Sequence, residues 1–174
     1  MAEYKSFQEG ITVNGEAILG LVTALESGQD TRLQILKKHG INPEPGKWYS
    51  QQASLDAFKE IASNIGNHTI FMIGKTMFEK AKGPSVDNIK EALGLIDQAY
   101  KMNNKGGDVG EYILKDFDEI NKTAVMVCRN PYPSEFDRGI ITSIVRKFKP
   151  KGSLKTDVTL DTTKETRLKG ADSC

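Results

Sequence analysis

The hydrophobic period of this chain changes partway along its length, and that change constrains the fold more than any other feature. Up to about residue 103 the apolar residues recur at helical spacing, as Ile18, Leu21 and Leu25 do. Two later segments, 111–117 and 123–129, have the composition of strands and flank a short polar turn. Helices followed by an antiparallel hairpin predict an α+β domain, not the alternating units of a parallel sheet.

Five helices are expected in the first part of the chain, each with an apolar face and a recognisable start or stop residue. Asn14 is placed to cap the first helix. Gly40 can end the second in the left-handed conformation, with Ile41 folding back onto Leu36. Gly66 ends the third. The expected ranges are 15–27, 31–39, 51–65, 69–80 and about 85–100.

The last part of the chain predicts one more helix and further strands. Ser134 and Asp137 have the spacing of a capping box, and the helix they begin stops at Pro150. Strict alternation of apolar and polar residues over 156–161 predicts a strand with one buried face. The chain reaches Cys174 where the return strand of a second hairpin should begin, so we expect the sheet to be one strand short.

Length and charge narrow the class of protein. The 174 residues fit one domain (1–174), with a helical part (14–103) and a sheet-and-helix part (109–174). Lys and Arg number 24 and Asp and Glu 23, so no net field favours nucleic acid, and we expect no such partner. No apolar run is long enough for a signal peptide or a membrane span, so a cytoplasmic location is expected.

Motifs that carry catalytic chemistry are missing from the sequence. There is no nucleophile elbow, zinc-protease helix, paired-cysteine motif or dinucleotide fingerprint. The tripeptide 74–76 resembles the end of a phosphate-binding loop, but Thr69 stands where its first glycine should be. His39 and His68 lie at predicted helix ends, where histidine commonly complements the helix dipole. We therefore interpret the chain as a protein that is not an enzyme.

Two stretches in the C-terminal half carry a family resemblance. Residues 124–132, followed by 136–141 and 146–148, resemble the strand-then-helix unit of the haem nitric-oxide/oxygen-binding (H-NOX) domains and the 4-vinyl-reductase-like domains. Residues 164–174 resemble the closing hairpin of the latter group. The resemblance implies helices packed on a twisted antiparallel sheet, with an apolar cavity between them. Such domains hold haem, phenols, acyl chains or tetrapyrrole intermediates, and act as sensors or assembly proteins.

The sequence departs from the haem-binding pattern at the residues that would hold the cofactor. In those domains a His on the helix before the sheet binds the iron, whereas here Tyr100 takes that place. The Tyr-x-Ser-x-Arg signature is incomplete, because Tyr132 and Ser134 are present but Phe136 replaces the arginine. Tyrosine ligates haem iron in some proteins, but a core aromatic is the simpler interpretation of Tyr100. We expect no haem.

A zinc site is implied for some relatives and is also incomplete. Those sensors hold zinc with cysteines of the closing hairpin and one on the preceding strand. Cys174 and Cys128 match two of these positions, and Thr166 stands at the third. Two thiolates without a nearby His make a poor tetrahedral site. We expect free thiols, one buried and one near the terminus, and no zinc.

The function expected from these observations is that of a non-catalytic sensor or carrier domain, which binds a small apolar molecule in an internal cavity. Apolar faces of the third to sixth helices would line the cavity, although the same residues would also serve as an ordinary core. The candidate lining residues are Phe58, Ile61, Phe71, Met77, Leu93, Ile96, Tyr100, Ile141 and Val145.

Two alternatives stay open at this point. The first is an assembly or protein-interaction subunit with a solid core. It would pair as a homodimer, or with a signalling partner, through an open sheet edge. The second is an enzyme that acts on a tetrapyrrole-like substrate. That alternative requires clustered acid and base groups, which the sequence does not show.

Overall fold

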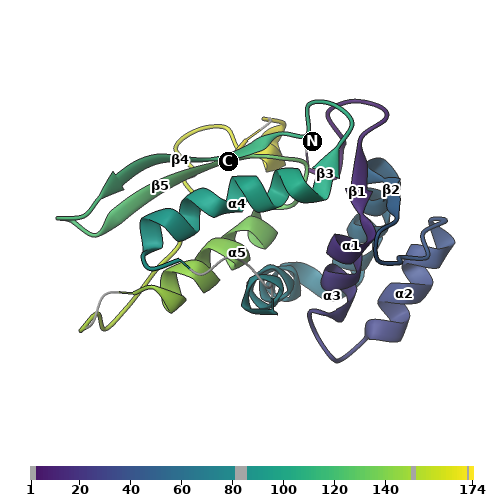
Figure 1. The fold of residues 1–174 in the computed structure, drawn as a ribbon, viewed down its shortest axis with the longest axis horizontal. Helices are drawn as coiled ribbons and strands as arrows, with labels where there is room; N and C mark the ends of the chain where they lie inside the picture. Colours follow the sequence, from purple (N-terminus) through teal and green to yellow (C-terminus); the bar gives the residue numbers. More distant parts are fainter. Residues whose placement is uncertain (1–2, 81–85, 150–151, 172) are drawn as a thin grey trace.

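The computed structural model describes residues 3–80, 86–149, 152–171 and 173–174, which form an α+β fold (Figure 1). The helices are α1 (Gly15–Thr23), α2 (Gln29–Lys38), α3 (Gln51–Lys80), α4 (Ile89–Asn103), α5 (Ser134–Lys147) and a short 3-10 helix, η1 (Arg167–Lys169). The strands are β1 (Thr12–Asn14), β2 (Trp48–Ser50), β3 (Asn104–Lys105), β4 (Glu111–Asp118) and β5 (Thr123–Arg129).

The strands form two antiparallel sheets. β1 lies between β2 and β3 in a small sheet, and β4 pairs with β5 in the hairpin that the sequence predicts. The hairpin register runs from Glu111 opposite Arg129 to Asp118 opposite Thr123. In Figure 1, α4 and α5 lie on one side of this hairpin, and α3 packs against α5.

Several predicted helix ends are confirmed, because each is determined by residues close together in the chain. The Asn14 side chain accepts a backbone N–H of the first turn of α1. Gly40 has a φ of 75°, and the Ile41 N–H donates to the Leu36 carbonyl at 2.9 Å. Gly66, with φ 76° and ψ 166°, divides α3 into the two arms that the pattern predicts. The expected start of the next helix near 85 lies outside the described residues, and α4 begins at Ile89.

The predicted capping box at Ser134 is wrong. The residue before the helix is Pro133, and the Ser134 side chain makes no local cap. Instead, Glu3 accepts hydrogen bonds from both the N–H and the hydroxyl of Ser134, each at 2.9 Å. Asp137 is buried, with 1% of its surface exposed, and bonds elsewhere. A carboxylate from the beginning of the chain therefore caps α5, and no local pattern could reveal it.

The predicted strand at 156–161 is also wrong. Side chains there alternate between half-buried and exposed, as the sequence pattern requires, but the segment pairs with no strand of the described chain. The expected closing hairpin over 164–174 is replaced by η1 and a turn at Gly170, which has a φ of 105°. Alternation determines which side chains are buried, but it does not supply a partner strand.

Helices α3 and α5 approach so closely that glycine is required on both. A Cβ atom at Gly74 would lie 2.2 Å from the carbonyl oxygen of Phe136, and one at Gly139 would lie 2.2 Å from that of Phe71. Backbone oxygens cannot move aside as a flexible side chain can. The glycines therefore set the distance between the two helices, and the glycine of the tripeptide 74–76 serves this packing.

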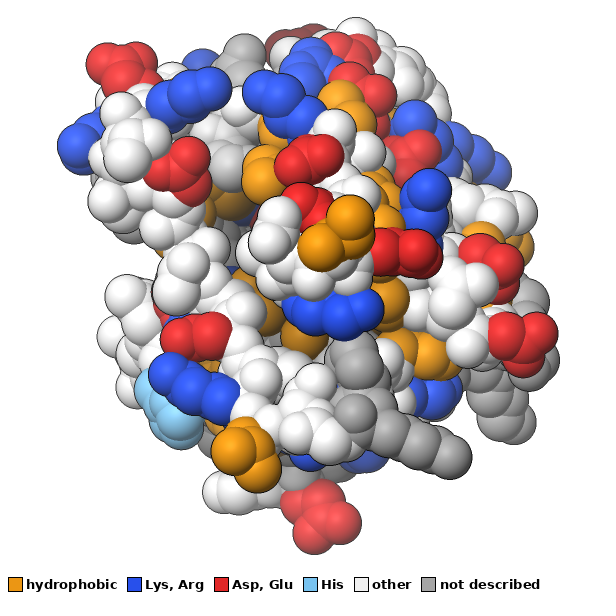
Figure 2. Space-filling model, turned by 90° about the vertical axis from the view of Figure 1, so that its left-hand side faces the viewer, with side chains coloured by type: hydrophobic (Ala, Val, Ile, Leu, Met, Phe, Trp, Pro, Cys, Tyr) orange, Lys and Arg blue, Asp and Glu red, His pale blue; other side chains and the backbone are white. Residues whose placement is uncertain are grey.

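Charges of both signs are interspersed on the face seen in Figure 2, with hydrophobic side chains visible between them. This agrees with the near balance of acidic and basic residues in the chain. Among the helices described, none has the length and apolar character needed to cross a membrane.

Candidate functional site

An apolar pocket of about 180 Å³ lies between α1, the two arms of α3, α4 and α5. An apolar cavity of about 150 Å³ is known to hold benzene, so this pocket has the size of a single-ring molecule. Its apolar lining consists of Val13, Ala17, Ile18, Leu21, Met77, Phe78, Ile96, Ala99, Phe136 and Ile140. The polar lining of the pocket consists of Ser54, Tyr100, Asn103, Asn104, Tyr112 and Tyr132.

Three of the nine predicted lining residues, Met77, Ile96 and Tyr100, are among those that line this pocket. Of the other six, Phe58, Ile61, Leu93 and Ile141 are buried in the core, and Val145 is half-buried against it. Phe71 is half-buried, and its ring lies under the Arg138 guanidinium. A ligand contact for any of the nine remains a prediction. Helical periodicity did not identify the contributions of α1, Tyr112 and Tyr132, because these come from packing between distant segments.

Most polar groups of the pocket are already engaged by the fold. Tyr100 donates its hydroxyl to the Val109 carbonyl at 2.5 Å, and Tyr112 donates to Asp137 at 2.5 Å. The Asn104 amide donates to the Tyr100 carbonyl at 3.0 Å. Burial raises the pKa of Tyr100, which opposes the deprotonation needed to bind haem iron. These groups are therefore committed to holding the pocket wall.

Two hydroxyls at the pocket, those of Ser54 and Tyr132, are not engaged. Both residues are more than nine-tenths buried, with 5% and 8% of their surfaces exposed. Neither hydroxyl has a hydrogen-bond partner within the described parts of the chain. Ser54 lies one helical turn before Phe58, whose ring is 6.3 Å from that of Tyr132. Burial, followed by the nearby charge of Asp137, raises the pKa of Tyr132, so its hydroxyl remains a neutral donor.

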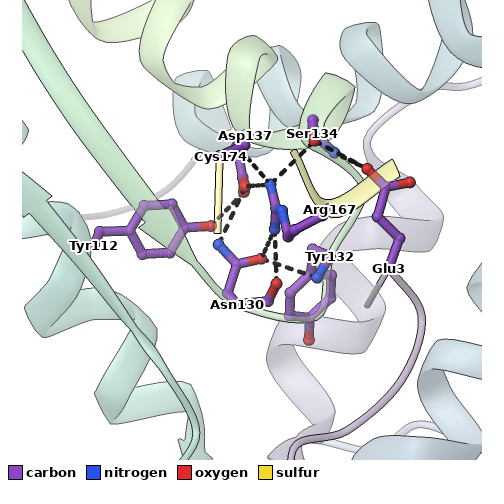
Figure 3. A network of polar contacts seen from close by, with 8 residues as sticks. All are labelled: Glu3, Tyr112, Asn130, Tyr132, Ser134, Asp137, Arg167 and Cys174. Carbon is purple, nitrogen blue, oxygen red and sulfur yellow. Dashed lines mark hydrogen bonds and ion pairs between the residues drawn. The ribbon is translucent and has the colours of Figure 1, made fainter. Parts of the chain in front are cut away.

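Next to the pocket lies a buried polar network centred on Arg167 (Figure 3). The Arg167 side chain is fully buried and forms an ion pair with Asp137 at 2.5 Å. Its Nη1 donates to the Asn130 carbonyl at 2.8 Å and to the Asn130 side chain at 2.6 Å. Burial alone would lower the pKa of Arg167, but Asp137 and Cys174 outweigh it and raise that pKa. The guanidinium therefore keeps its charge inside the protein.

The network and the pocket share Tyr112. Its ring lines the pocket, and its hydroxyl donates to Asp137 on the far side of the wall. Asp137 also accepts from the Asn130 amide at 3.1 Å. The position of one pocket residue thus depends on the ion pair between Asp137 and Arg167.

Two sulfurs and a carboxylate also meet at this network. The donor atoms of Cys128, Asp137 and Cys174 all lie within 4.8 Å of one another, close enough to surround a cation. However, the Arg167 guanidinium already contacts both Asp137 and Cys174, the latter at 2.8 Å. A metal ion would have to displace that cation from two of three donors. The geometry therefore does not favour zinc, and the absence of zinc remains a prediction.

Together the fold and the site define an α+β domain with a small apolar pocket and a buried ion-pair network beside it. Comparisons with known protein families, curated proteins and solved structures found no match. The resemblance to the 4-vinyl-reductase-like domains therefore stands as a proposal.

Proposed function

We propose that this domain is a non-catalytic sensor or carrier that binds a small apolar molecule in the pocket between α1, α3, α4 and α5. The observation that carries the proposal is the pair of unengaged hydroxyls, Ser54 and Tyr132, at an otherwise apolar wall. Both hydroxyls belong to mostly buried residues at the pocket, and neither is used by the fold, so both are available to a bound molecule. A ligand with one polar group would supply the missing hydrogen bond and fill the apolar space.

The size of the pocket favours one ligand class among those that the resemblance implies. A volume of about 180 Å³ suits a single ring or a chain of similar bulk. Haem and other tetrapyrroles contain four such rings and are far larger. With a hydroxyl donor and acceptor available, a one-ring phenol or alcohol fits best, and the expectation that haem is not bound is retained.

The chemistry of the pocket supports a role without catalysis. Its titratable side chains are tyrosines, and burial raises the pKa of Tyr100, Tyr112 and Tyr132. Its lining, as far as the structure describes it, contains neither a carboxylate nor a histidine. A general base would need a pKa near the working pH, which none of these tyrosines has. The alternative of an enzyme is therefore not favoured.

The family relation is part of the same proposal. Residues 124–132 form most of β5 and the turn that follows, and the resembling residues after them belong to α5 and its C-terminal end. The order strand, turn and helix is that of the unit that the two families share. This order supports a 4-vinyl-reductase-like fold, although the closing hairpin is missing from the described residues.

One surface feature favours the alternative of an assembly subunit. Ile113 and Val125, on the two strands of the β4–β5 hairpin, are 43% and 47% exposed. Apolar side chains on a sheet face can meet a second copy of the chain or a signalling partner. We keep this as the second candidate function.

Ligand screening with native mass spectrometry tests both candidates on the same sample. Freshly purified protein is first sprayed to detect a co-purifying molecule, and is then titrated with phenol, benzyl alcohol and the two-ring 2-naphthol. The proposal predicts saturable binding of one one-ring molecule per chain and weaker binding of 2-naphthol. A protein that binds none of these and runs as a dimer would contradict the proposal and support the assembly alternative.

A further inference from the structure

The two cysteines of the chain lie directly opposite each other, although they are 46 residues apart in sequence. The Cys128 N–H donates to the Cys174 carbonyl at 2.9 Å, and the Cys174 N–H donates back at 3.2 Å. Two residues that exchange both hydrogen bonds form an antiparallel pair, with Cα atoms about 5.5 Å apart and side chains on one face. This spacing falls within the range of disulfides, and the two sulfurs lie within 4.8 Å.

Their surroundings make the two thiols chemically unequal. Arg167 directs its charged Nη2 at the Cys174 sulfur from 2.8 Å. The interaction with the Cys128 thiol, followed by the charge of Arg167, outweighs burial and lowers the pKa of Cys174 to about 7. The interaction with Cys174, followed by burial, raises the pKa of Cys128. Cys174 is half-buried and Cys128 is buried.

We propose that Cys174 and Cys128 form a peroxide-reactive dithiol, in which Cys174 is the nucleophile and Cys128 the resolving thiol. The structure provides the required parts: a half-buried sulfur beside a guanidinium, and a second sulfur on the residue that exchanges two backbone hydrogen bonds with it. A guanidinium stabilises both the thiolate and the oxygen anion that leaves when a peroxide is attacked. The pair is distinct from the pocket, and the proposal does not depend on ligand binding there.

The reaction consumes one molecule of hydrogen peroxide and balances in two steps. The Cys174 thiolate attacks one peroxide oxygen, a sulfur–oxygen bond forms, and the oxygen–oxygen bond breaks. The leaving hydroxide takes a proton and departs as water, so Cys174 becomes a sulfenic acid. The Cys128 sulfur then attacks the Cys174 sulfur, and the sulfur–oxygen bond breaks. The departing hydroxide takes the Cys128 proton as the second water, and the product is a disulfide.

The position of Cys174 also predicts that the disulfide is reversible. Cys174 is half-buried, so a small-molecule thiol can reach its sulfur, and accessible disulfides are the labile ones. Such a thiol should therefore return both cysteines to the reduced state.

Intact-mass analysis of the reduced full chain after equimolar hydrogen peroxide tests the proposal. Wild type should lose two hydrogen atoms and both free thiols without forming a disulfide between chains, and a peptide map should join Cys128 to Cys174. The two variants serve as matched controls. Cys128→Ser should stop at a sulfenic acid on Cys174 that dimedone traps, and Cys174→Ser should leave Cys128 reduced. Dithiothreitol should reverse the wild-type change.

Alkylation by iodoacetamide provides an independent measurement. In the reduced wild type, the rate at Cys174, read by peptide mapping, should rise with a midpoint below that of an ordinary cysteine, since thiolate is the reactive form. A pKa of 7 in place of 8.5 gives roughly 15-fold more thiolate at pH 7. Disulfides only between chains, direct over-oxidation of Cys174 without a disulfide, or equal reactivity of the two cysteines would each overturn the proposal. The peptide map of the wild type tests the proposed disulfide even if a variant fails to fold.

Discussion

Replacing Arg167 with methionine should destabilise this protein more than the loss of any single surface charge. The change keeps most of the side-chain volume but leaves Asp137 as a buried carboxylate without its cation. Breaking one side of a buried ion pair costs about 3–5 kcal/mol. Asp137 keeps hydrogen bonds from Tyr112 and Asn130, so we expect about 3–4 kcal/mol. Domains have only about 5–15 kcal/mol of stability in total.

Urea unfolding followed by circular dichroism measures this effect, with the free energy of unfolding taken from linear extrapolation. A double-mutant cycle with Asp137→Asn should show that the two losses are not additive, with a coupling of about 1–3 kcal/mol. The matched control is Arg138→Met, whose pair with Glu135 is about one-third exposed on each side. Such pairs contribute about 1 kcal/mol or less.

The reasoning is refuted if Arg167→Met costs no more than Arg138→Met, or if the cycle shows no coupling. Arg138 also stacks over the Phe71 ring at 4.3 Å, so the control loses more than an ion pair and makes the comparison stricter.

Four further substitutions test the packing and the electrostatics of the fold. Gly139→Ala should cost about 1–3 kcal/mol in thermal unfolding, because its Cβ would strike backbone of α3. Gly94→Ala in α4 meets nothing within 4 Å and should stabilise by about 0.5–1 kcal/mol, and equal effects would contradict the packing account. Glu3→Ala should cost about 1 kcal/mol by uncapping α5, whereas an unchanged melting temperature would show that this cap is unimportant. Arg129 lowers the pKa of Asp108, so Asp108→Asn should cost less than about 1 kcal/mol at pH 7. The difference in stability between the wild type and Asp108→Asn should disappear as the pH falls below about 3.9, the ordinary pKa of Asp, and through the lowered pKa of Asp108. A difference that persists in acid would contradict the ion pair between Asp108 and Arg129.

Local sequence signals predicted a large part of this fold. The cap at Asn14, the turn at Gly40 and the break at Gly66 each depend on residues within a few positions of one another. The same holds for the β4–β5 hairpin, whose strands are joined by a short turn. These elements were predictable because the interactions that determine them are local.

The features that were missed depend on contacts between distant segments. Ser134 has a local capping pattern, but Glu3 supplies the cap from 131 residues away. The strand expected at 156–161 has the right alternation and no partner. Arg167 lies in a charged stretch whose composition predicts exposed side chains, yet its side chain is fully buried against Asp137. Two of the three sequence-selected pocket residues, Ile96 and Tyr100, came from the strongly amphipathic pattern of α4.

Binding of phenol and of toluene by the wild type and by Tyr132→Phe tests the proposed function most directly. The two ligands have similar size, but only phenol can use the unengaged hydroxyl. Isothermal titration should show phenol binding weakened about two- to tenfold in Tyr132→Phe, the effect of one neutral hydrogen bond of about 0.5–1.5 kcal/mol. Toluene binding should be unchanged, and the control Tyr49→Phe, outside the pocket, should bind both ligands as the wild type does. If the wild type binds neither ligand, or if Tyr132→Phe binds phenol as tightly as the wild type, the account of this pocket is wrong.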